Sequence, residues 1–164
     1  MIDPAIARTA AAAFAARQAV ARQMIRGGKM TRAEADRRLA PWAAIACLAG
    51  ADLPELAEPL AERVTRDVAD YWQVTEAQAR AELAPAICPR ARWAPLLAKA
   101  RDAAIRTADQ IAGSARARPD EYPAARDQAF ALIALADALR LDPNGRHDVP
   151  LAFADPAFVK EPAR

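Results

Sequence analysis

The chain has 164 residues, of which 54% are hydrophobic and 27% charged, and its formal net charge is +2. This length fits one domain, and the mixture of apolar and charged residues excludes a disordered chain. Much of the hydrophobic share is alanine, the best helix former. We therefore expect an all-α fold, an irregular bundle of five to seven helices whose core depends on a few large side chains.

The first 50 residues are predicted to form a basic helical hairpin. Asp3-Pro4 is typical of a helix start, and Gly27-Gly28 is typical of a helix end. Thr31 and Glu34 have the spacing of a capping box, which opens a second helix. Pro41 lies inside this second helix and removes one backbone hydrogen bond, so a kink or a break is expected there.

Basic residues gather on one side of the first predicted helix and in the following turn. At 100° per residue, the helical ones lie nearly opposite the apolar side. Arg17 falls on the apolar side, where its stem would pack and its charged head would reach water. The candidate contacts for a polyanion or for an acidic protein partner are Arg8, Arg22, Arg26, Lys29 and Arg32.

Charge alternates along the chain: residues 1–38 and 89–118 are basic, and residues 39–88 and 119–164 are acidic. Pairing of basic with acidic segments inside the fold is the interpretation that we favour. A basic face that binds a polyanion is the alternative.

Residues 51–145 are predicted to form the helical body of the same compact domain. Pro59 is expected to restart a helix that runs to about residue 73, and Thr75 to open a short helix to residue 84. The proline-containing stretch 85–95 is expected to be irregular. Two longer helices should follow, the second of them beginning near Asp120 and being the most apolar of all.

Residues 75–93 loosely resemble a helix-turn-helix, with Arg90 and Arg92 as candidate nucleic-acid contacts. Pro85 and Pro89 stand where the turn and the recognition helix should lie, and they weaken this interpretation.

The residue types needed for catalysis or for metal binding are scarce. His147 is the one histidine, and Cys47 and Cys88 are the only cysteines, so no zinc-binding spacing exists. No glycine-rich phosphate loop occurs either. We expect no catalysis, no metal and no cofactor. The longest uncharged stretch, residues 39–51, is too short to span a bilayer, and we expect a cytoplasmic protein with reduced cysteines.

Residues 146–164 differ in character, because prolines alternate there with isolated apolar side chains. We expect an extended tail that lies on the protein's own core or docks on a neighbouring molecule. The candidate docking residues are Val149, Leu151, Phe153 and Phe158.

The segment Gly28 to Asp36 is similar to a Gly-basic-Met-Thr-x-Ala-x-Ala-Asp segment of small uncharacterised proteins from bacterial prophage regions. The resemblance implies a phage-related accessory or structural protein, and it supplies no functional residue to transfer. We therefore expect a non-catalytic interaction or assembly protein that binds a protein partner or itself, and no membrane. The alternative is a small DNA-associated protein.

Overall fold

The computed structural model of the chain describes residues 3–68 and 75–141. These residues form six α-helices and no strand, which confirms the predicted all-α bundle. None of the described helices is long and apolar enough to cross a membrane. The helices are α1 (Pro4–Arg26), α2 (Arg32–Leu48), α3 (Pro54–Val68), α4 (Glu76–Ile87), α5 (Arg90–Ala112) and α6 (Glu121–Ala138).

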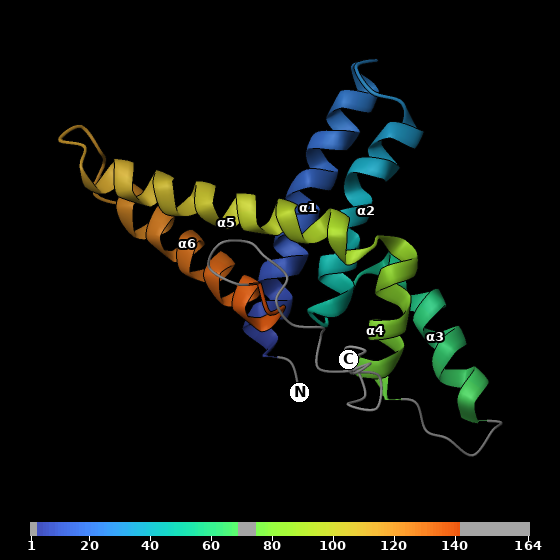
Figure 1. Cartoon of the computed structure of the whole chain (residues 1–164). Helices are drawn as coiled ribbons and strands as arrows, with labels where there is room; N and C mark the ends of the chain where they lie inside the picture. The colour runs from blue at the N-terminus through green and yellow to red at the C-terminus, as the bar shows by residue number, and fades with distance from the viewer. Residues whose placement is uncertain (1–2, 69–74, 142–164) are drawn as a thin grey trace, which may run out of the picture.

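Neighbouring helices pack in pairs, α1 with α2, α3 with α4 and α5 with α6. The α1/α2 pair, here called the first arm, and the α5/α6 pair, the second arm, project from a common body in different directions (Figure 1). The predicted N-terminal hairpin is the first arm. Contacts of α2 with α4 and α5, and of α1 with α6, hold the three pairs together.

Side-chain caps explain where several helices begin. The Asp3 carboxylate accepts a hydrogen bond from the Ala5 backbone N–H at 2.8 Å. The capping box of α2 is present in full, since the Glu34 N–H donates to the Thr31 hydroxyl and the Thr31 N–H donates to the Glu34 carboxylate. Thr75 and Gln78 repeat this arrangement at the start of α4. Each cap satisfies backbone donors that a helix start leaves without a partner.

Gly28 ends α1 in the left-handed conformation, with φ of +67°. Its N–H donates to the Ile25 carbonyl at 3.0 Å, and the Lys29 N–H donates to the Met24 carbonyl at 2.9 Å. These two bonds form a Schellman motif, which turns the chain sharply between α1 and α2.

The breaks predicted at internal prolines do not occur. Helix α2 continues through Pro41, and Pro59 lies inside α3 instead of starting a helix. Pro85 and Pro95 lie inside α4 and α5, so the predicted irregular stretch shrinks to Cys88 and Pro89. A proline removes one hydrogen bond, and the packing of buried residues on either side of it outweighs that loss.

The core lies where the C-terminal half of α2 meets α4, α5 and α6. Its largest fully buried side chains are Ile45, Trp93, Leu97 and Leu135. Alanines between them let the helix backbones approach closely. Cys47 is fully buried among these residues, where it serves as a small hydrophobic side chain.

A buried arginine joins α4 to the end of α2. Arg80 is 5% exposed, and its Nη1 donates to the carbonyl oxygens of Ala51 at 2.9 Å and Cys47 at 3.4 Å. Its Nη2 lies 2.7 Å from the Glu76 carboxylate and 3.5 Å from that of Asp52. The guanidinium therefore provides donors for two carbonyl oxygens at the turn after α2, while the two carboxylates balance its charge.

Candidate interaction surfaces

The basic residues predicted from the sequence do not form one patch. Arg22, Arg26, Lys29 and Arg32 lie toward the free end of the first arm, where all four are exposed and have no ion pair with any described residue. Arg8 belongs to the other end of α1, about 20 Å away by the rise of the helix. The free end of the first arm is therefore the basic surface of this arm.

An apolar groove of about 340 Å³ runs along the first arm between α1 and α2. Val20 is its most exposed large apolar residue, with 56% of its surface accessible. Arg17 and Arg38 provide the charges of the groove, and its other lining residues are Ala16, Val20, Ala21, Met24, Met30 and Leu39. An apolar floor beside two arginines is complementary to a partner surface that is apolar at its centre and acidic at its edges.

Arg17 is held in place by its own arm. Its guanidinium carbon lies 3.3 Å from the centroid of the Trp42 ring, and its Nη1 donates to the Ala13 carbonyl at 2.8 Å. Partial burial lowers the pKa of Arg17 from its ordinary value, and the group stays protonated at neutral pH. The sequence predicted a charged head that reaches water, and the structure differs in this respect, because the guanidinium lies over the Trp42 ring.

A second groove of about 720 Å³ lies where the first arm meets the start of α3. Here the Gln18 amide donates to the Glu55 carboxylate at 2.8 Å, and Arg22 and Arg32 are among the lining residues. This amide–carboxylate bond links the basic segment 1–38 to the acidic segment 39–88. Among the described residues, no ion pair joins these two segments, so the internal charge pairing that we favoured does not account for the exposed arginines.

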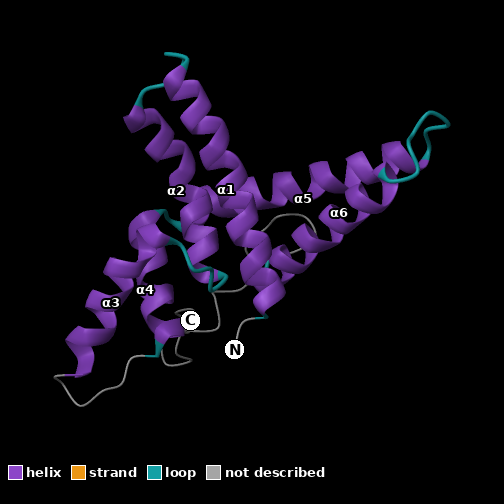
Figure 2. Cartoon of the chain, turned by 180° about the vertical axis from the view of Figure 1, so that it is seen from behind, coloured by secondary structure: helices purple, strands orange, loops and turns teal. Residues whose placement is uncertain are grey.

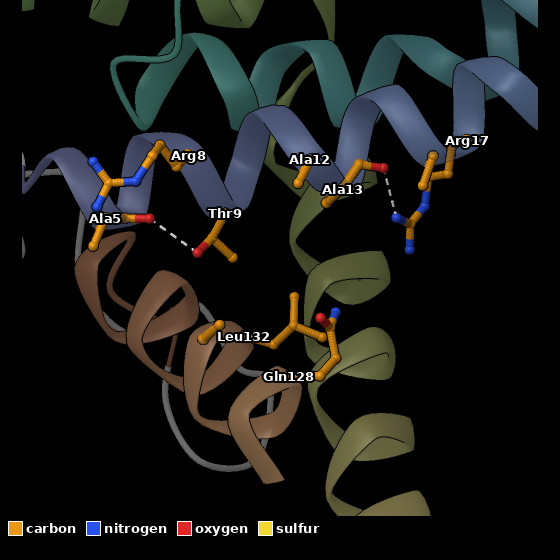
Figure 3. A pocket seen from close by; sticks show the side chains of 10 residues that line it. Ala5, Arg8, Thr9, Ala12, Ala13, Arg17, Gln128 and Leu132 are labelled. Atoms are coloured by element: carbon orange, nitrogen blue, oxygen red, sulfur yellow. Dashed lines mark hydrogen bonds between the residues drawn. The ribbon is translucent and has the colours of Figure 1, made fainter. Parts of the chain in front are cut away.

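A notch of about 620 Å³ separates α1 from α6 (Figure 3). Four alanines of α1 form one wall, and Gln128, Ala131 and Leu132 of α6 form the other. The Thr9 hydroxyl donates back to the Ala5 carbonyl of its own helix at 2.9 Å. The lining residues include no carboxylate, imidazole or thiol, so they offer no general base to activate the Thr9 hydroxyl.

Arg90 and Arg92, the candidates from the helix-turn-helix resemblance, have different surroundings. The Nη2 of Arg90 donates to the Arg140 carbonyl at 3.0 Å, beyond the end of α6, and its guanidinium lies 5.3 Å from the Trp93 ring centroid. Its Nε and Nη1 are buried without a hydrogen-bond partner, and burial lowers the pKa of this guanidinium. A cation at the C-terminal end of a helix stabilises that end. Arg90 thus contributes to the fold, and only Arg92 of this pair is exposed.

The outward side of α6 is an apolar surface that was not among the candidate sites predicted from the sequence. Phe130 is 61% exposed and Ile133 is 39% exposed, whereas Leu132 and Leu135 of the same helix face the core. Apolar residues occur on every side of α6, so hydrophobicity alone did not separate the two faces. A projection at 100° per residue, combined with the position of α5, does separate them.

Chemically reactive groups are few in the described part of the chain. It contains no cluster of three or more His, Cys, Asp or Glu residues that could hold a metal ion. Both cysteines are buried free thiols; burial raises the pKa of Cys47 to about 11 and also raises that of Cys88. Protonated thiols are poor nucleophiles. His147 and the predicted tail contacts Val149, Leu151, Phe153 and Phe158 lie outside the described residues.

Comparison with known proteins finds no match: no family model, no curated protein and no solved structure is similar to this chain. The resemblance of residues 28–36 to prophage proteins therefore stays a prediction. Inference about function depends on the surfaces described above.

Proposed function

We propose that this protein is a non-catalytic interaction protein that contributes to a larger assembly through its two arms. The observation that carries the proposal is that each arm presents a large apolar side chain to solvent, Val20 on α1 and Phe130 on α6. Both arms project from the body, which leaves these helices open along much of their length (Figure 2). Exposed apolar residues bordered by charged ones are typical of contact surfaces between proteins.

The first arm suits a partner that presents an apolar side chain and acidic neighbours. The apolar group would enter the groove beside Val20 and Leu39, and the carboxylates would meet Arg17 and Arg38. The segment that resembles prophage proteins, residues 28–36, includes the turn of this arm. For this reason we include a phage-related role in the proposal. Two free thiols agree with a cytoplasmic location.

Site-specific cross-linking in cells of the source organism tests this function. A photo-reactive amino acid at Val20 should give a discrete adduct, while the same group at Glu82, an exposed residue of α4, should give none. Arg38→Glu should weaken the adduct at position 20, because it places a carboxylate at the edge of the groove. Equal adducts from positions 20 and 82, or none from either, would contradict the proposal for the first arm.

Nucleic acid is the second candidate partner, favoured by the four unpaired cations at the free end of the first arm. Guanidinium groups suit phosphate, and each phosphate contact adds about −0.9 to the slope of log affinity against log salt concentration. Arg26→Ala should reduce the magnitude of that slope by about 1, whereas Arg106→Ala, at an exposed position of α5, should leave it unchanged. Absence of duplex binding at low salt would exclude this candidate.

A further inference from the structure

One face of α6 lies free along the second arm. Its members, Arg126, Phe130, Ile133 and Asp137, are spaced three or four residues apart, and all are exposed. At 100° per residue they share one side of the helix, here called the outward face of α6. Phe130 is the most exposed large hydrophobic side chain among the described residues. No contact within the described part of the chain accounts for its position.

The order of residues on this face is self-complementary. Phe130 and Ile133 flank a midpoint; Arg126 lies four residues before Phe130, and Asp137 lies four residues after Ile133. If a second α6 is laid antiparallel across this midpoint, Phe130 meets Ile133 of the second copy and Arg126 meets Asp137 of the second copy. By the helix rise, the apolar pair lies about 2 Å, and the charged pair about 8 Å, from the two-fold axis. A two-fold contact makes each pair twice.

The two charged groups are available for such a contact. The Nη2 of Arg126 lies 3.3 Å from the carboxylate of its chain neighbour Asp127, and because both groups are exposed this pair contributes little. Asp137 has no ion pair with any described residue, and it lies in the last turn of α6, where a negative charge is unfavourable. Placing an arginine of another molecule beside Asp137 relieves that unfavourable charge.

The other sides of α6 are in use. Leu132, Leu135, Ala136 and Leu139 belong to the core, and Gln128, Ala131 and Leu132 face α1 across the notch. By the same projection, the outward face points away from both sets. A second helix can therefore approach it without meeting α1 or α5.

We propose that this protein forms a two-fold symmetric dimer in which the outward face of α6 packs antiparallel on the same face of a second copy. The inference rests on the proposed assembly function and names the partner of the second arm. One helix face buries less area than a standard interface, so the dimer should be weak and depend on concentration, with half-association at about 10–100 µM.

Sedimentation equilibrium of the full chain over about 5–300 µM tests the dimer. The wild type should associate, and Arg126→Asp or Asp137→Arg should each weaken association about tenfold, because like charges then face each other twice. An equimolar mixture of these two variants should recover most of the association, since an all-acidic face then meets an all-basic one. Phe130→Ser should abolish association, and its circular dichroism should show that the helices remain.

The control is Arg106→Asp, which reverses an exposed charge on α5 and should leave association unchanged. The proposal is overturned by a chain that stays monomeric at about 300 µM, by a mixture that associates no better than the single variants, or by a dimer that Phe130→Ser does not weaken. The failures are distinguishable: a monomeric chain that still cross-links through Val20 refutes the dimer and leaves the proposed function of the first arm intact.

Discussion

Replacing Arg80 with alanine should destabilise the protein more than removing either of its acidic partners. The guanidinium is buried, but the carboxylates that it contacts are not: the side chain of Glu76 is 66% exposed, and that of Asp52 is fully exposed. Without Arg80 the carboxylates return to water at little cost. The Ala51 carbonyl, which belongs to a residue only 2% exposed, loses the donor at 2.9 Å.

The expected magnitude follows from these contacts. A buried acceptor left without a donor costs about 1–3 kcal/mol, and losing the packed stem of a long side chain adds to this loss. We expect Arg80→Ala to lower the free energy of unfolding by about 3 kcal/mol, which corresponds to a fall in Tm of about 6–12 °C for a chain of this size. Arg80→Met keeps most of the volume and should cost about 1–3 kcal/mol. Glu76→Ala should cost less than about 1 kcal/mol, because that pair is largely solvated.

Urea denaturation followed by circular dichroism and tryptophan fluorescence measures all three variants. The order of stability should be wild type, Glu76→Ala, Arg80→Met and then Arg80→Ala. A loss of unfolding free energy below about 1 kcal/mol for Arg80→Ala, or equal losses for Arg80→Ala and Glu76→Ala, would refute the reasoning. Either result would mean that the buried carbonyl contacts stabilise the fold no more than an exposed ion pair does.

Three further predictions concern the turn, the stacked arginine and the buried thiol. Gly28→Ala should cost about 1 kcal/mol through its φ of +67° alone, since no atom lies within 4 Å of the new Cβ. Gly27→Ala, whose Cβ makes an ordinary 3.5 Å contact with the carbonyl oxygen of Gln23, should leave stability nearly unchanged. Equal losses of unfolding free energy for the two variants in urea denaturation would contradict this explanation. Arg17→Ala should lower stability by about 1 kcal/mol and change the tryptophan emission, because the guanidinium lies over Trp42; an unchanged spectrum would argue against the stacking. Burial raises the pKa of Cys47 from 9.0 to about 11, so the folded chain keeps a proton that the unfolded chain releases. Stability should therefore fall by about 1.4 kcal/mol per pH unit between pH 9 and 11, and Cys47→Ala should remove this slope; parallel pH curves for the two proteins would count against it.

Helix starts were predictable because they depend on local contacts. Asp3, Thr31 and Thr75 cap helices with residues two or three positions away, and these bonds form whatever the rest of the chain does. The same is true of the turn at Gly28, whose conformation few other residues adopt. The local sequence alone therefore predicted both ends of α1 and the beginnings of α2 and α4.

The internal prolines led to wrong predictions because a proline removes a hydrogen bond locally, whereas the contacts that stabilise the helix around it come from distant parts of the chain. Pro41 is followed at once by buried Trp42, and Ile45 lies fully buried one turn later. Before Pro41, Ala35 packs with Ala21 and Met30 of the first arm, and after it α2 contacts α4 and α5, so tertiary packing holds the helix on both sides of the missing bond. Such long-range contacts cannot be derived from proline spacing.

The candidate surfaces were predictable in part. Exposure of Arg8, Arg22 and Arg26 followed from helical periodicity, whereas the inward turn of Arg90 depends on the end of α6, fifty residues later in the chain. The outward position of Phe130 likewise depends on which side of α6 meets α5. Charge and periodicity describe a helix on its own. Which of its two apolar faces is buried depends on where the neighbouring helix lies.

The contact of α1 with α6 also determines the order in which the fold can be completed during synthesis. The α1/α2 pair can form as soon as both helices have left the ribosome, because its contacts are close in sequence. The alanine-lined side of α1 must wait for α6, which is made about a hundred residues later. A nascent chain arrested before residue 121 would thus lack the contacts of α1 with α6, and the emergence of the last described helix is the step that completes them.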